Sequence, residues 1–126
     1  MHATLPLIIA GFLSADIRIP ASDGFALRAT YSAGRAGGGA VLMLHQCDRE
    51  GMATGLEPLE TALAGAGIAT LSLDYRGYGG SITGKTQDED ARHRGSDIAA
   101  AYRVLRERSG AKNIAVVGAS CGCRRA

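Results

Sequence analysis

The sequence has no tryptophan, three cysteines, three prolines and an aromatic content of only 5%. Three cysteines are too few for a miniprotein held together by disulfides, and they form no paired C-x-x-C clusters of the kind that bind structural zinc. No apolar run reaches the roughly 18 residues that a membrane-spanning helix needs. We therefore expect a domain stabilised by ordinary apolar burial, with no membrane span.

Neither sign of charge dominates the chain. Fourteen Lys and Arg stand against twelve Asp and Glu, which gives a formal net charge of +2 over 126 residues. A field this weak argues against nucleic acid or an anionic membrane as the main partner. The length fits one globular domain and leaves no room for a second.

The N-terminal segment has two interpretations. Residues 5–15 are apolar and as long as a signal-peptide h-region, but residues 1–4 contain no Lys or Arg. We therefore divide the chain into residues 1–15, an apolar leader or signal-peptide remnant, and residues 16–126, the folded domain. Cleavage of the leader would make the protein exported or periplasmic. An uncleaved leader would be a strand at the domain edge of a cytoplasmic protein.

Several segments have the patterns of β-strands. Residues 16–20 and 25–31 alternate in polarity around a four-residue turn sequence, which predicts an antiparallel hairpin. Three short apolar runs predict buried strands, at residues 40–44, 68–73 and 113–117.

Two stretches with helical spacing lie between these strands. The first begins near Thr54 or Gly55, so that Pro58 falls in its first turn, and its apolar stripe is Met52, Leu56, Leu59 and Leu63. The second is capped by Ser96 or Asp97, ends at Ser109 and Gly110, and carries Ile98, Ala101, Tyr102 and Leu105. Alternating strands and helices predict an α/β fold, a three-layer sandwich with a mostly parallel sheet that follows the N-terminal hairpin.

The strongest chemical signal is the pattern Gly118-x-Ser120-x-Gly122 directly after the last predicted strand. A nucleophile elbow needs this spacing, because its serine sits on a sharp strand-to-helix turn where small neighbours let the backbones approach. The pattern is common, and the alternative is a glycine-rich turn without a nucleophile. The preceding strand and crossovers favour the nucleophile.

A second signal is the segment after the first parallel strand, residues 45–49. This loop should lie beside the elbow, because the carboxyl ends of parallel strands meet at one edge of the sheet. The backbone N–H of Cys47 or Gln46 can then join that of Cys121 in binding the oxyanion of a tetrahedral intermediate. For the His45 side chain we favour a local role, capping the strand and bonding nearby backbone.

The ordered segments VLMLHQCDRE, LSLDYRGYGGS and IAVVGASCG resemble the N-terminal half of the α/β-hydrolase superfamily. The chain is similar to its dienelactone-hydrolase-like and serine-esterase members. The resemblance implies that Ser120 is the nucleophile and that the amides of Cys47 and Cys121 form the oxyanion hole. It also implies a loop at residues 74–81 near the site without a catalytic side chain, and an ester-like small-molecule substrate in the full-length parent. We expect no cofactor and no metal, because Cys121 and Cys123 alone are too few ligands for a zinc site.

The histidines depart from that family's pattern, in which an acid and then a histidine follow the serine. Here His2, His45 and His93 all precede Ser120. We interpret residues 88–94, around His93, as a solvated approach to a helix. Loss of the catalytic histidine costs about 10⁶-fold in kcat, so we expect a truncated serine hydrolase that is inactive as given.

Two alternatives remain open. The chain can instead be a non-catalytic, flavodoxin-like α/β module whose GASCG loop binds a phosphate-containing ligand at a helix N-terminus, or a folded but inactive interaction protein. If the amides of Cys47 and Cys121 face one oxygen, their backbones are neighbours and the two residues can form a disulfide. Two small buried side chains are an equally good interpretation.

Overall fold

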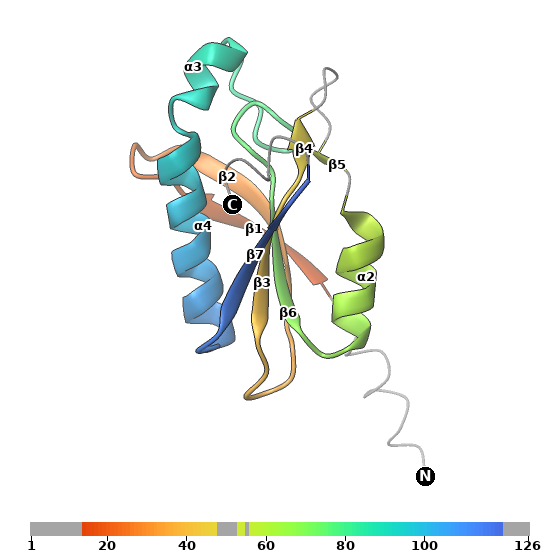
Figure 1. The fold of residues 1–126 in the computed structure, drawn as a ribbon. Coiled ribbons are helices and arrows are strands. Elements are labelled where there is room, and N and C mark those ends of the chain that lie inside the picture. The colour runs from red at the N-terminus through yellow and green to blue at the C-terminus, as the bar shows by residue number, and fades with distance from the viewer. Residues whose placement is uncertain (1–13, 48–52, 55, 120–126) are drawn as a thin grey trace.

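The computed structural model describes residues 14–47, 53–54 and 56–119 of the chain (Figure 1). Its first two strands, β1 (Ser14–Pro20) and β2 (Ala26–Ser32), pair antiparallel along their whole length. In the turn between them Gly24 adopts a φ of +91°, a conformation that side chains disfavour. The predicted hairpin is confirmed, and β1 begins two residues before the predicted domain boundary at residue 16.

Five strands form one mixed sheet in the order β1-β2-β6-β3-β7. The three strands predicted to be buried are β3 (Ala40–Leu44), β6 (Ala69–Leu73) and β7 (Ile114–Gly118), and β3 pairs parallel with both of its neighbours. Burial is confirmed for β3 and for most of β6, but it was wrong for β7, which lies at the edge of the sheet and has no buried residue. The hairpin joins them through an antiparallel pairing of β2 with β6. A separate two-stranded ladder consists of β4 (Gln46–Cys47) and β5 (Ala53–Thr54).

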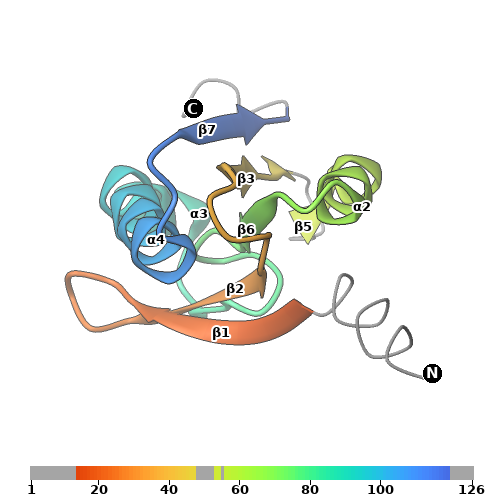
Figure 2. The same cartoon turned by 90° about the horizontal axis from the view of Figure 1, so that it is seen from below.

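Two long helices cover opposite faces of this sheet. The chain passes from β3 through α2 (Glu57–Gly65) to β6, and then through α4 (Arg94–Ser109) back past β3 to β7. Right-handed crossovers that run in opposite directions place their helices on opposite sides. Figure 2 shows this arrangement, with the sheet between α2 and α4. The predicted three-layer α/β sandwich is confirmed.

The helix starts differ from those predicted. The helix α2 begins at Glu57 and keeps Pro58 in its first turn, whereas Met52 lies outside the described residues. The helix α4 begins at Arg94, before the predicted caps at Ser96 and Asp97. The Asp97 carboxylate does not cap the helix because it accepts hydrogen bonds from Arg76 instead.

A short helix, α3 (Gln87–Ala91), precedes α4 and was not predicted. Thr86 and Glu89 form a capping box at its start. The interpretation of residues 88–94 as solvated was wrong for two of them, since Asp90 and Arg94 are buried. Asp90 accepts hydrogen bonds from the Thr83 hydroxyl, and the guanidinium of Arg94 lies 4.4 Å from the centre of the Tyr75 ring.

The main core joins α4 to the sheet. All five residues of β3 are buried, and the core cluster combines Leu42, Leu71 and Leu105 with residues of the hairpin. By contrast, α2 has no fully buried residue, and its Leu59 is 38% exposed. Among the helices of the described ranges, none is long and apolar enough to cross a membrane.

Candidate active site at the carboxyl edge of the sheet

The carboxyl ends of three parallel strands lie level with one another. Leu44, the last residue of β3, is in register with Leu73 of β6 and with Gly118 of β7. Ligands of open α/β sheets bind at this edge, where loops leave towards opposite faces. The residues that follow the three strands are therefore the candidates for the site.

Ala119 is held directly beside the end of β3. Its backbone N–H donates to the carbonyl oxygen of Leu44 at 3.1 Å, which continues the pairing of the two strands by one residue. This bond places the residue that precedes Ser120 next to the loop that begins at His45. Ser120 and Cys121 lie outside the described residues, so their roles as nucleophile and oxyanion amide remain predictions.

Cys47 lies in the short ladder that follows β3. It is in register with Ala53, and Gln46 is in register with Thr54. The ladder thus shapes the chain immediately beyond the end of β3. The assignment of the Cys47 amide to an oxyanion hole also remains a prediction, as does a disulfide between Cys47 and Cys121.

His45 connects the ends of two strands. It is buried, its Nδ1 lies 2.6 Å from the carbonyl oxygen of Gln46, and its Nε2 accepts a hydrogen bond from the backbone N–H of Tyr75 at 3.1 Å. Its ring also packs on the rings of Tyr75 and Tyr78, with centres 4.2 and 5.3 Å away. The predicted local role is confirmed, and it extends to the loop after β6.

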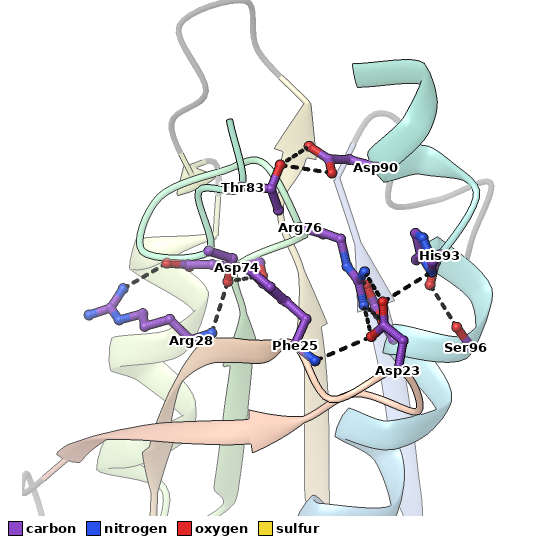
Figure 3. Close-up of polar contacts among 11 residues, drawn as sticks. Asp23, Phe25, Arg28, Asp74, Arg76, Thr83, Asp90, His93 and Ser96 are labelled. Atoms are coloured by element: carbon purple, nitrogen blue, oxygen red, sulfur yellow. Dashed lines mark hydrogen bonds and ion pairs between the residues drawn. The ribbon is translucent and has the colours of Figure 1, made fainter. Parts of the chain in front are cut away.

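The loop after β6 is fastened to the hairpin on one side (Figure 3). The Asp74 carboxylate accepts hydrogen bonds from the Arg28 guanidinium at 3.1 Å and from the Gly80 N–H at 2.8 Å. The hydroxyl of Ser81 donates to the carbonyl oxygen of Asp74 and accepts from the N–H of Arg28. These contacts hold the loop, which supplies the Tyr75 N–H to His45, in one conformation.

Arg76 fastens the same loop on its other side (Figure 3). Its buried guanidinium donates to both carboxylate oxygens of Asp97 and to both of Asp23, at 2.7 to 3.0 Å. The hydrogen bonds from Arg76 hold the pKa of Asp23 well below its usual range, whereas burial raises the pKa of Asp97. His93 Nδ1 lies 3.9 Å from Asp23 and so joins this charged group at its exposed end.

Two pockets lie near this edge. A small one of about 140 Å³ includes His45 and Asp74, the first residues after β3 and β6, together with Glu57 and Glu60 of α2. A larger one of about 560 Å³ lies between the β1–β2 turn and α3, and its walls include Asp23, Phe25 and Arg92. The sequence predicted both His45 and the loop at residues 74–81 near this edge, but not the hydrogen bonds by which Asp74, Arg76 and Ser81 fasten that loop.

Solved structures of hydrolases share this fold. An esterase of Pyrococcus furiosus is 21% identical, with a TM-score of 0.66 over 88% of this chain and 43% of that esterase. A Xanthomonas campestris α/β serine hydrolase without a lid is 16% identical, with a TM-score of 0.68 over 90% of this chain and 54% of that protein. A thermostable carboxylesterase from a metagenomic library is 25% identical, with a TM-score of 0.61 over 92% of this chain and 41% of that enzyme.

The chain thus spans about half or less of the length of these relatives. No curated protein matches the sequence significantly. The alpha/beta hydrolase fold family, however, matches residues 49–126, which is more than half of the 126 residues. Together with the sheet order and the strand-edge geometry, this match shows that the chain belongs to the alpha/beta hydrolase fold family.

Proposed function

We propose that this chain carries the nucleophile and oxyanion hole of a serine hydrolase that cleaves ester-like or lactone bonds. The observation that carries the proposal is the hydrogen bond from Ala119 N–H to Leu44 O, because it fixes the chain just before Ser120 at the carboxyl edge of the sheet. A serine that directly follows a parallel strand at this edge has the position that a nucleophile elbow requires.

The proposed reaction proceeds through an acyl-serine intermediate. The Ser120 hydroxyl oxygen adds to the acyl carbon while a histidine base takes its proton, and the carbonyl electrons move onto oxygen. The bond from the acyl carbon to the leaving oxygen then breaks, and the proton passes to that oxygen. Water hydrolyses the acyl-serine by the same two steps. Backbone N–H groups of Cys47 and Cys121 would stabilise the negative oxygen in each tetrahedral intermediate.

The proposed base does not come from the described histidines. Both ring nitrogens of His45 are engaged by backbone groups, and His93 lies near Asp23 at the start of α4. An unassisted serine hydroxyl is a weak nucleophile. We therefore propose that this chain by itself does not turn over substrate, and that the acid and the base belong to other parts of the parent enzyme.

A fluorophosphonate probe tests the proposal on the complete gene product. The wild type should be labelled at one serine, and Ser120→Ala should abolish labelling. Ser22→Ala is a matched control, because Ser22 is exposed in the β1–β2 turn and should leave labelling unchanged. Labelling that persists in Ser120→Ala would overturn the assignment of the nucleophile.

Nucleotide binding, measured on the same sample, distinguishes the phosphate-binding alternative from the serine hydrolase. A flavodoxin-like module should bind a nucleotide such as FMN and should not react with the probe. The family match favours the hydrolase. Nucleotide binding without labelling would favour the binding module.

A further inference from the structure

We propose that His45 is a positioning residue, which sets the direction of the Cys47 amide through the peptide group between Gln46 and Cys47. The inference rests on the proposed function, because it names the residue that orients one N–H donor of the proposed oxyanion hole. It gives His45 a task other than that of the catalytic base.

Two backbone partners of His45 define its protonation state. The Gln46 carbonyl oxygen can only accept a hydrogen bond, so Nδ1, 2.6 Å away, must carry the proton. The Tyr75 backbone N–H can only donate, so Nε2, 3.1 Å away, must be unprotonated. His45 is therefore neutral, with its proton on Nδ1.

The bond to Gln46 acts on the next amide. A trans peptide group is planar, and its C=O and N–H point in opposite directions. The described chain contains no cis peptide bond. Because the Gln46 carbonyl is drawn towards the imidazole of His45, the N–H of Cys47 must point away from that ring. We propose that the substrate oxygen binds on that side.

The imidazole can fix this direction only if the ring itself is fixed. Its Nε2 is held by Tyr75, which belongs to the loop that Arg28 and Arg76 fasten to the hairpin. Its face packs on Tyr75 and Tyr78, and its exposed fraction is 5%. The support of the amide therefore extends from the hairpin through the loop after β6 to His45.

Two variants of His45 separate its two hydrogen bonds. The side-chain amide of His45→Asn lies as far from the backbone as Nδ1 does, so it can donate to the Gln46 carbonyl but cannot reach Tyr75. The longer side chain of His45→Gln can accept from Tyr75 at the place of Nε2. If the direction of the Cys47 amide determines the rate of hydrolysis, His45→Asn should preserve that rate and lower the melting temperature. His45→Gln should preserve the melting temperature and lower the rate.

The test compares the wild-type complete gene product with His45→Asn, His45→Gln and His45→Ala, using p-nitrophenyl butyrate and a boronic acid inhibitor. Loss of one oxyanion donor costs about 10²–10³ in kcat, so Gln and Ala should lose about 10²-fold in kcat with KM unchanged. Boronic acid affinity should fall with kcat, because the tetrahedral adduct needs the same amide. Asn should stay within about tenfold of the wild type.

Each outcome bears on one claim. Equal rates for Asn and Gln, or rates that simply follow the melting temperature, would overturn the role of His45 and leave the proposed function intact. A proton on Nε2, detected by long-range nitrogen NMR of the imidazole, would also overturn it. A wild-type product that neither hydrolyses the ester nor reacts with a fluorophosphonate would overturn the proposed function, and the role of His45 with it.

Discussion

Arg76 and Asp97 form a two-pronged ion pair that is closed to solvent. Nε and Nη2 of the guanidinium each lie 3.0 Å from a different oxygen of the carboxylate, and the side chains are only 6% and 2% exposed. Asp23 binds the same guanidinium from the hairpin turn. A single cation thus ties together three segments that are far apart in the sequence.

Removing this cation should destabilise the fold. Arg76→Met leaves Asp97 buried without its partner, and breaking a buried pair on one side costs about 3–5 kcal/mol. The stability of Arg76→Lys should fall between that of this variant and that of the wild type, because an ammonium keeps the positive charge but cannot form the paired hydrogen bonds of a guanidinium. Urea unfolding measures the stability of both variants. Arg92→Met, at an exposed position, is the control and should change stability by less than about 0.5 kcal/mol.

The same group predicts how stability depends on pH. The hydrogen bonds from Arg76 lower the pKa of Asp23 from its ordinary value of 3.8, so Asp23 contributes stability above that value and loses it as the pH falls towards the folded pKa. Burial raises the pKa of Asp97, so its contribution has the opposite sign and is lost as the pH rises through the folded pKa.

Two matched variants separate these contributions. Asp23→Asn should make the decline of unfolding free energy below about pH 4 shallower, since it removes a group that releases its proton on folding. Asp97→Asn should act above about pH 4, where it removes a group that takes up a proton on folding, so that the unfolding free energy gains less as the pH falls through that range. Urea unfolding at a series of pH values between about 2 and 6 gives both slopes. Equal slopes in the two variants would contradict the opposite signs.

The strands could be predicted because their signal is local. Continuous apolar runs and two-residue alternation identified β3, β6, β7 and the hairpin, and the glycine at residue 110 correctly ended α4. The start of α4 could not be found in this way. Asp97 has the chemistry of a cap, but its carboxylate is bound by Arg76, which lies 21 residues earlier in the chain.

In the candidate site, too, local features could be predicted and contacts between distant residues could not. The strand ends were placed at one edge by the α/β pattern, and His45 was correctly assigned a local bond. Its second bond, to Tyr75, joins residues 30 positions apart and has no sequence signal of its own. Asp90 and Arg94 were misjudged for the same reason, because burial of a charge depends on distant partners such as Tyr75.

The two faces of the sheet should differ in their response to lost apolar volume. Leu71 is fully buried in the core cluster under α4, so Leu71→Ala should cost about 2–5 kcal/mol. Leu59→Ala makes the same chemical change on α2, where the side chain is 38% exposed, and should cost well under half as much. Thermal unfolding of the two variants measures the difference. Equal costs would contradict the assignment of the main core to the α4 face.

Two glycines with the same backbone angle separate conformational strain from steric conflict. Gly24 and Gly77 both have a φ of +91°. A Cβ at position 24 would meet nothing within 4 Å, whereas one at position 77 would lie 2.6 Å from a carboxylate oxygen of Asp90. Gly24→Ala should therefore cost about 1–3 kcal/mol from strain alone, and Gly77→Ala clearly more.

A double-mutant cycle isolates the steric part at Gly77. Combined with Asp90→Ala, which removes the oxygen that the new methyl group would strike, Gly77→Ala should cost no more than Gly24→Ala does. Urea unfolding of the two single variants and the double variant gives the coupling energy. A coupling energy near zero would mean that Asp90 moves aside freely, although its carboxylate is anchored by Thr83. The loop after β6 would then be less rigid than its hydrogen bonds to the hairpin and α4 imply.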